Sequence, residues 1–395
     1  MKRSCKDVDL RDPATVQPWV EECVTRHRKR HDFRRLLARS GGLRGAELDA
    51  AQAGDRALLA RASRAIAGDM CARIAARELA LPPVTYRERV DASSGKTRLI
   101  GNEDAAQQVL DYIAVRASAP IWRRRIVAQQ VAGMPGRGAL YAMRMIRGWV
   151  EADDRAARWA KAHHVRYTRR CRFHVKLDVR KCYPSLRVGR FMALFERDCA
   201  NRDLLWLWEA LLSSHAGDGY EGFMIGAMTS QWACQYMLSF LWRHAMALTH
   251  ATRRGHRVRS VEHMALQMDD LLLVGCDRRA LVDAARSVAS LAQALLGLEV
   301  KGGWQALRLV ESPIDLAGWR VHHGGCVDMR PRIALRTRRS VLRFRCRAPD
   351  VRRARRVTAY YGWARNASSG RFRRVYAVDR AAKSAAKMIS EGERA

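Results

Sequence analysis

The sequence lacks several features that would assign it to a common class of protein. Its 10 cysteines form no C-x2-C or C-x4-C pair, so no zinc ribbon or finger is readable. Scattered cysteines of this kind are usually reduced and structural. No apolar stretch of about 20 residues is present, and the first residues, MKRSCKDVDLRDP, are polar rather than signal-like. We therefore expect a soluble, cytoplasmic protein that does not enter a membrane.

Acidic residues are scarce beside basic ones. The chain has 39 Asp and Glu against 73 Lys and Arg, which gives a net charge of +34 and a pI near 10.9. Such a chain repels itself unless it meets a polyanion, and each phosphate contact with a nucleic acid releases condensed counterions. A GC-rich genome accounts for part of the arginine excess, and an anionic membrane surface is the weaker rival. The charge therefore predicts a nucleic-acid-binding protein.

The length of 395 residues and the 48% apolar content predict a large core and two to three subdomains around a shared cleft. Residues 1–82 are basic and helical in pattern, either a solvated helical face or an extension that contacts nucleic acid. The runs VTYRERV and KTRLI flank the turn-rich DASSG and predict a hairpin. Further helices are predicted over 104–118, 188–215, 227–248 and 278–297 and from 330 onward, whereas 153–172 is charged and loop-like.

Asp269 and Asp270 are the strongest local candidates for chemistry. They stand in Gln267-Met268-Asp269-Asp270 between the apolar runs HMAL and LLLVG, a pattern that predicts a hairpin with a polar tip. Adjacent carboxylates repel each other and need cations or hydrogen bonds to stay ionised. A solvated Asp-Asp turn is the ordinary alternative, but both flanks look like buried strands.

Asp178 ends a second apolar strand, in HVKLDVRKCYPSL. If this strand lies beside the Asp269–Asp270 hairpin, three carboxylates converge. That arrangement suits two Mg²⁺ ions, of which one lowers the pKa of an attacking hydroxyl and the other binds the triphosphate and the leaving pyrophosphate. Oxygen ligands favour Mg²⁺ over a soft metal, with Mn²⁺ as a substitute.

In their order along the chain, these segments resemble the motifs of bacterial reverse transcriptases of the retroelement type. The resemblance runs from about residue 83 to about residue 370. GKTRLI and AGMPGRGALYAM resemble the two finger motifs, HVKLDVRKCYPSL the first catalytic motif, and GFMIGAMTSQWACQYML the second. QMDD stands where the family has Tyr-x-Asp-Asp, LGLEVKGGWQ resembles the fourth motif, and SPIDLAGWRV the primer grip.

The resemblance implies roles for individual residues. Asp178, Asp269 and Asp270 would hold the metals, with the Val179 carbonyl as a further ligand. Tyr183 would be the gate that selects deoxynucleotides, although a core aromatic is its ordinary alternative. The remaining residues implied to bind the nucleotide or line its site are Lys96, Arg98, Arg137, Gly226, Ser230 and Gln231; for Lys96 and Arg98 a solvated hairpin is the alternative.

The resemblance also implies contacts to the primer and duplex by Gln267, Gly318 and Trp319. Gln267 stands where the family has a tyrosine. The glutamine side chain can still form hydrogen bonds, but it lacks the aromatic ring. Lys301 would act as a general acid that protonates pyrophosphate, with a surface lysine as the alternative. Trp363, in TAYYGWARNASSG, either stacks on a base or packs in the core.

The resemblance implies an α+β right-hand polymerase. Its expected parts are the N-terminal region 1–82, fingers with the first palm strand over 83–175, a palm over 176–325, and an Arg-rich helical thumb with the tail over 326–395. The implied activity is RNA-directed DNA synthesis from dNTPs, with an RNA template, a DNA primer or product, and a protein partner or second copy of the chain left open. The expected role is antiphage defence with a dedicated non-coding RNA. The alternatives are a diversity-generating retroelement enzyme and, in a different class, an inactive nucleic-acid-binding scaffold.

Overall fold

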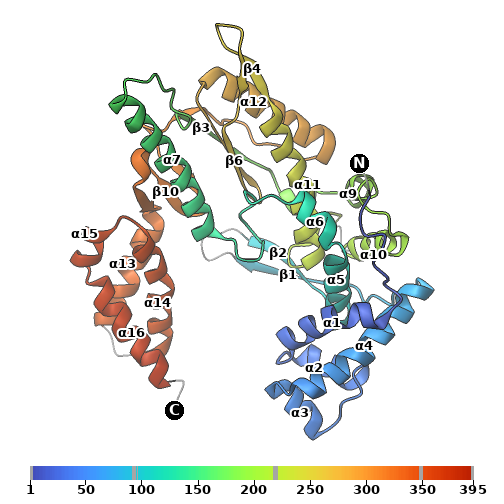
Figure 1. Cartoon of the computed structure of the whole chain (residues 1–395). Coiled ribbons are helices and arrows are strands. Elements are labelled where there is room, and N and C mark those ends of the chain that lie inside the picture. Colours follow the sequence, from blue (N-terminus) through green and yellow to red (C-terminus); the bar gives the residue numbers. More distant parts are fainter. Residues whose placement is uncertain (1–2, 91–94, 96, 217–220, 347–349, 393–395) are drawn as a thin grey trace. The chain divides into compact units, whose positions relative to one another are not determined.

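The protein combines helices with short strands (Figure 1). The chain forms two compact units. The computed structural model describes residues 3–90, 95, 97–216, 221–346 and 350–392. Unit 1 comprises Met1–Ala128, Val179–Leu241 and Ala289–Val300, and unit 2 comprises Gln129–Asp178, Trp242–Val288 and Lys301–Ala395. Helices make up 57% of the structure, so the mixed helix and sheet class is confirmed. The layout of fingers, palm and thumb stays a prediction.

Unit 1 begins with helices whose first turns are capped by aspartates. Asp12 accepts hydrogen bonds from the amides of Ala14 and Thr15 at the start of α1 (Pro13–His27), and Asp55 accepts one from Leu58 at the start of α4 (Arg56–Ala76). Such carboxylates satisfy amides that have no partner within the helix. With α2 (His31–Arg39) and α3 (Ala46–Ala53), these helices confirm the predicted helical character as far as Ala76.

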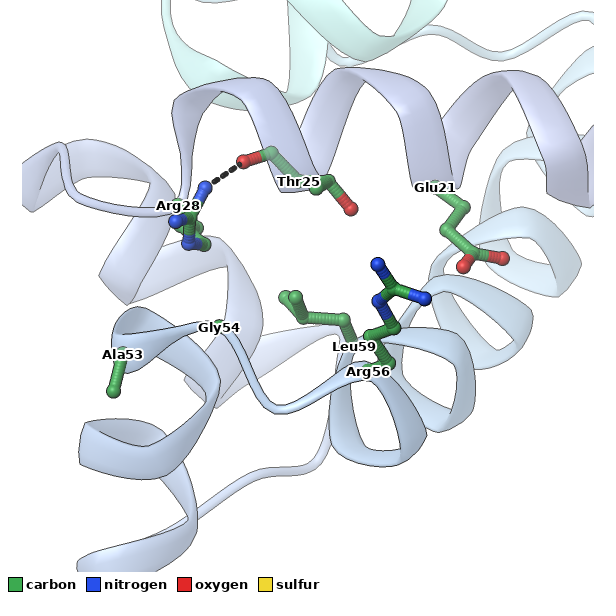
Figure 2. A pocket seen from close by; sticks show the side chains of 7 residues that line it. All are labelled: Glu21, Thr25, Arg28, Ala53, Gly54, Arg56 and Leu59. Carbon is green, nitrogen blue, oxygen red and sulfur yellow. Dashed lines mark hydrogen bonds between the residues drawn. The ribbon is translucent and has the colours of Figure 1, made fainter.

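A cavity of about 500 Å³ lies among these N-terminal helices (Figure 2). Arg28 is one of its lining residues, and Nη1 of that side chain donates a hydrogen bond of 2.8 Å to the Thr25 carbonyl near the end of α1. Arg56 and Glu21 add charges of opposite sign to the lining. The residues predicted to carry chemistry do not line this cavity.

The hairpin predicted in unit 1 is present. Strands β1 (Thr85–Val90) and β2 (Thr97–Asn102) pair antiparallel from Thr85 opposite Asn102 to Val90 opposite Thr97. Most of the DASSG tip, and Lys96, lie outside the described residues.

A cluster of five aromatic side chains forms the centre of unit 1. Trp122, Phe191, Phe195, Trp208 and Tyr236 have neighbouring ring centroids 5.0–5.8 Å apart. Both indole N–H groups find acceptors, the Val115 carbonyl at 2.8 Å and Ser118 Oγ at 2.9 Å, as buried indoles require. The cluster joins α6 (Ala119–Arg125), α9 (Val188–Phe195), α10 (Arg202–Ser213) and α11 (Met228–Ala247).

Unit 2 is built on a four-stranded antiparallel sheet with the order β6-β7-β3-β8. Its strands are β3 (Phe173–Asp178), β6 (His263–Gln267), β7 (Asp270–Gly275) and β8 (Leu307–Arg308). A smaller sheet has the order β11-β10-β9, formed by β9 (Ile314–Leu316), β10 (Trp319–Val321) and β11 (Val327–Met329), and β4 (Thr249–Ala251) pairs with β5 (Arg257–Arg259). The hairpin predicted around QMDD is thus confirmed.

Helices cover these sheets. Helix α7 (Ala139–Ala162; green in Figure 1) packs Met143, Ile146 and Val150 into one core cluster with Leu272 and Val274 of β7. The other helices of this region are α12 (Arg278–Leu291), α13 (Pro331–Cys346), α14 (Val351–Asn366), α15 (Gly370–Val375) and α16 (Val378–Gly392). Within the part of the chain that the structure describes, no helix has both the length and the apolar character needed to cross a bilayer.

The structure corrects two expectations about local structure. Residues 196–201, expected within a helical region, instead separate α9 from α10. Residues 153–162 were expected in a charged loop and instead form the last turns of α7. Their alanines and arginines are good helix formers, and Asp154 forms an i,i+4 ion pair of 3.3 Å with Arg158. Charge marks a solvent-facing surface here rather than a break in the helix.

Candidate active site

Strand pairing places Asp178 directly opposite Asp270. Asp178 is the last residue of β3 and Asp270 is the first of β7, and their antiparallel register runs from Phe173 opposite Gly275 to this pair. Residues opposite each other in such a ladder have Cβ atoms about 4.5–5.5 Å apart. A slip of one residue would turn both side chains to the other face of the sheet, so the apolar strands fix the position of the two carboxylates.

Asp269 lies at the exposed tip of the hairpin between β6 and β7. Gln267 pairs with Asp270, which leaves Met268 and Asp269 as a two-residue turn. Met268 has a φ of 54°, in the left-handed region that residues other than glycine rarely adopt. The structure thus brings Asp178, Asp269 and Asp270 to one end of the sheet in unit 2.

Two lysines contact these carboxylates. Lys176 Nζ lies 3.0 Å from Asp270 Oδ2, and Lys301 Nζ lies 2.6 Å from Asp178 Oδ1. The Lys301 amide also donates a hydrogen bond of 2.8 Å to the Asp178 carbonyl. Lys301 was predicted at the site, whereas Lys176 was missed. Its position two residues before Asp178 could have revealed it, because alternate residues of a strand share one face.

The electrostatics of Asp270 indicate a need for positive charge. Burial raises the pKa of Asp270 above its ordinary value, Lys176 acts against that increase, and the charges of Asp269 and Asp178 add to it. A bound cation would therefore favour the ionised form.

The donor set fits Mg²⁺ in chemistry, because carboxylate oxygens are its preferred protein ligands. As the side chains stand, no three His, Cys, Asp or Glu residues within the described ranges are gathered closely enough to hold a metal ion. Asp178 and Asp270 pair with lysines instead. A metal ion would therefore have to compete with Lys176 and Lys301 for these carboxylates.

Gln267 borders the carboxylates with an unsatisfied acceptor. Its Oε1 atom is shielded from solvent and has no hydrogen-bond partner among the residues described. A buried acceptor without a partner is costly, so this atom could accept a hydrogen bond from a ligand. Its predicted contact with the primer stays a prediction.

Arg137 belongs to a loop that folds back beside β6. The Val131 amide donates to the Leu266 carbonyl at 2.8 Å, and the Leu266 amide donates to the Gln129 carbonyl at 2.9 Å. Arg137 Nη1 donates to the Gln130 carbonyl at 3.1 Å. The glycine-rich loop is therefore held next to the strand that leads to the aspartates.

Gly318 and Trp319 are buried in the core of unit 2. Ala317 and Gly318 both have positive φ, 53° and 89°, in the turn between β9 and β10. A Cβ atom on Gly318 would come within 2.8 Å of Trp363, whose ring lies 4.5 Å from that of Trp319. Trp319 is 3% exposed, which leaves little side-chain surface for a duplex. Trp363 packs in the core, as its ordinary alternative predicts.

Residues predicted to bind the nucleotide also occur in unit 1, where close backbone packing joins their segments. The Tyr183 carbonyl, in α8 (Cys182–Ser185), accepts a hydrogen bond of 3.0 Å from the Phe223 amide. A Cβ atom on Gly226, whose φ is 126°, would lie 2.7 Å from the Gly101 carbonyl oxygen at the end of β2. Tyr183, Gly226 and the hairpin that carries Arg98 are thus linked within this unit. Val179 is buried and bridges to Val300.

Ser230 belongs to a buried polar network at the start of α11. Its Oγ lies 3.3 Å from His215 Nδ1, and His215 Nε2 lies 3.1 Å from Glu103 Oε1. Asp111, in α5 (Ala105–Ala117), accepts hydrogen bonds from the Thr229 amide at 3.0 Å and from the Thr229 hydroxyl. These contacts hold the segment that carries Ser230 and Gln231. The apolar helical pattern around Asp111 could have revealed this acid, because it falls on the buried face.

The shifted pKa values of Glu103, Asp111 and His215 favour the uncharged form of each group. Burial raises the pKa of Glu103 to about 8 and also raises that of Asp111, whose neighbour Glu103 adds to the increase. Burial lowers the pKa of His215. Near pH 7 the network is therefore held by hydrogen bonds between largely uncharged groups, which avoids the cost of buried ions.

Replacing Glu103 by Gln should flatten the dependence of stability on pH. The folded-state pKa of about 8 exceeds the ordinary 4.5, so the contribution of Glu103 is fully present below about pH 4.5 and is lost as the pH rises through about 8. The raised pKa of Asp111 likewise makes stability fall as the pH rises. The lowered pKa of His215 has the opposite effect below pH 6.5. Urea unfolding at pH 5 and pH 8 measures this; the exposed control Glu209→Gln should keep the wild-type dependence. Equal dependence in wild type and Glu103→Gln would contradict the assignment.

Replacing Lys176 by Met should strengthen Mg²⁺ binding, because it removes the cation that competes for Asp270. A partly exposed ion pair contributes up to about 1 kcal/mol, so the affinity should rise by up to roughly fivefold. Titration calorimetry with MgCl₂ gives the affinity directly. Lys387→Met, which removes a lysine 3.7 Å from Glu391, is the matched control and should change nothing. An unchanged or weaker affinity in Lys176→Met would argue against a metal at Asp270.

Comparison with known proteins identifies distant structural likenesses. No protein-family model matches the chain, and no curated protein matches it. A structure of apo telomerase from Candida tropicalis, truncated from its C-terminal domain, is 12% identical with a TM-score of 0.39, covering 63% of this chain and 54% of its own. An in situ structure of the BmCPV RNA-dependent RNA polymerase in its quiescent state is 11% identical with a TM-score of 0.43, covering 89% of this chain and 31% of its own. The chain thus spans about half of the first protein and a third of the second.

Proposed function

We propose that the protein is an RNA-directed DNA polymerase whose active site is Asp178, Asp269 and Asp270. The observation that supports this most is the pairing of Asp178 with Asp270 across adjacent strands, with Asp269 at the next position of the hairpin tip. Three carboxylates at one end of a sheet suit phosphoryl transfer, in which catalysis rests on positioning and on neutralisation of charge.

The proposed reaction joins a deoxynucleotide to a priming hydroxyl. The hydroxyl oxygen forms a bond to the α-phosphorus, the bond to pyrophosphate breaks, and the hydroxyl proton passes to water. Two Mg²⁺ ions bound at the aspartates would activate the hydroxyl and neutralise the leaving group. Lys301 lies beside Asp178, and we propose that its ammonium group gives a proton to pyrophosphate.

The other proposed roles concern the nucleotide. Lys96, Arg98 and Arg137 would bind the triphosphate or the templating region, because guanidinium and ammonium groups suit phosphate. Tyr183 would exclude a ribose 2′-hydroxyl by its ring, and its position is fixed by the hydrogen bond from the Phe223 amide. Gly226 and Gln231 would line the site, and Ser230, which is buried, would hold their segment through the network around His215.

For the biological role we propose antiphage defence with a dedicated non-coding RNA as template. The alternative is a diversity-generating retroelement enzyme. The motif IGAMTSQ, at 225–231, resembles both groups, while Gln267 and the N-terminal helices favour the first. The template is the discriminating observation, since the first role requires a separate non-coding RNA and the second a repeat that it rewrites.

An inactive scaffold is the alternative of a different class. Such a protein would bind nucleic acid through its net charge of +34 without synthesis. The presence of all three aspartates favours the enzyme, because loss of even one metal ligand would disable metal-assisted transfer.

Replacing Asp269 and Asp270 together by Ala should abolish extension of a DNA primer on an RNA template in the presence of Mg²⁺ and dNTPs. The expected loss is at least about 1,000-fold, since metal ligands act as a unit. Gel analysis of a labelled primer measures the product, and the exposed acid Asp283, replaced by Asn, is the control that should keep wild-type activity. Undiminished extension by the double variant would refute the site; absence of extension by the wild type on every template would favour the scaffold.

A further inference from the structure

The last turn of α7 presents an aromatic pair to solvent. Trp159 is 57% exposed, and its ring stacks on that of His163 with centroids 4.4 Å apart and planes inclined by 22°. We call Trp159, His163 and the basic residues between 155 and 172 the α7 platform. More than half of the Trp159 surface is therefore open to a ligand.

The aromatic pair is held in place by the end of the helix. His163 Nδ1 lies 2.8 Å from the Trp159 carbonyl, to which it can donate a hydrogen bond. His164 then takes a left-handed conformation with a φ of 57°, and the Val165 amide donates to the Ala160 carbonyl at 2.8 Å. One face of the indole therefore rests on an anchored imidazole, which lowers the entropy that a ligand on the exposed surface must overcome.

The surroundings of the pair are basic throughout. Residues 155–172 contain one lysine and six arginines and no acidic residue. Arg158 and Arg169 are paired with Asp154. Arg155, Lys161 and Arg166 are exposed and form no ion pair within the described residues. Arg155 stands one helical turn before Trp159, on the same face of α7.

Another tryptophan of the same helix shows what a structural role looks like. Trp149 stacks on His263 with centroids 4.6 Å apart and packs against the core of unit 2. Trp159 has a comparable histidine partner but more than half of its surface in solvent. Burial in the core therefore accounts for Trp149 and leaves Trp159 unexplained.

We propose that the α7 platform binds a base of single-stranded nucleic acid on Trp159, with neighbouring phosphates at Arg155, one helical turn away on the same face, and at Arg166, in the exposed segment that follows the helix. Aromatic stacking combined with a basic surface is the usual means of binding single strands, and a duplex would keep its bases stacked internally. A protein partner is the less favoured occupant, because the patch lacks acidic residues to pair with a mixed surface. The site goes beyond the proposed polymerase activity, since binding here requires neither the aspartates nor synthesis.

Photocrosslinking locates the contact on the full-length protein. A U12 RNA containing 5-iodouridine, and its T12 DNA counterpart with 5-iododeoxyuridine, are irradiated with the protein, and the crosslinked peptides are identified by mass spectrometry. Crosslinks to 155–172 that disappear in Trp159→Ala support the platform, and the stronger of the two arms identifies RNA or DNA as the ligand. Crosslinks confined to other segments overturn it.

Fluorescence anisotropy tests the stacking itself. Trp159→Ala should weaken binding of U12 by roughly 5- to 100-fold, the range for loss of one base stack, and Trp159→Phe should retain most of the affinity. An abasic 12-mer should bind wild type and Trp159→Ala alike. Arg166→Gln should weaken binding, whereas the charge-matched control Arg286→Gln should not. Any of three results would overturn the proposal. Wild type and Trp159→Ala could bind U12 equally, Trp159→Ala could lose as much affinity for the abasic strand as for U12, or the substitution could change only self-association.

Discussion

The pairing of β3 with β7 is the interaction on which the candidate active site depends. Six consecutive residue pairs, ending at Asp178 and Asp270, hold two carboxylates opposite each other by backbone hydrogen bonds and apolar packing rather than by contacts of the aspartates themselves. Such a site can carry mutually repelling charges because the ladder behind it supplies the stability. The hairpin to β6 then adds Asp269 without any further element.

The protein holds two groups of acids in different ways. At the sheet end, Lys176 and Lys301 lie 3.0 and 2.6 Å from Asp270 and Asp178, so the negative charge is balanced by cations that a metal ion could displace. In unit 1, Glu103 and Asp111 have raised pKa values and are held in a hydrogen-bonded network with His215 and Thr229. Lysine side chains that a metal ion can displace suit a site where a reaction takes place. An uncharged hydrogen-bonded network suits a segment that only has to be held in position.

Sequence patterns predicted the strands, the hairpin around Asp269–Asp270 and the α+β class, because apolar runs and turn residues act locally. They placed the end of α7 in a loop, because arginines on a solvent-facing helix resemble a charged connection. The contact of Lys176 with Asp270 was missed because it depends on which strand lies beside β3. The partners of Asp111 and Glu103 were missed because those contacts join segments more than 100 residues apart. The burial of Trp319 against Trp363 is likewise a tertiary feature.

The proposed activity requires that Asp178, Asp269 and Asp270 together bind divalent metal. Crystals of the protein grown with Mn²⁺ and a deoxynucleoside triphosphate would test it most directly, because anomalous scattering from manganese locates the ion without assumptions about activity. We expect anomalous peaks within about 2.0–2.3 Å of carboxylate oxygens of these three residues, with Lys176 and Lys301 turned away from them. Manganese bound elsewhere, with both lysines still paired to Asp270 and Asp178, would contradict it.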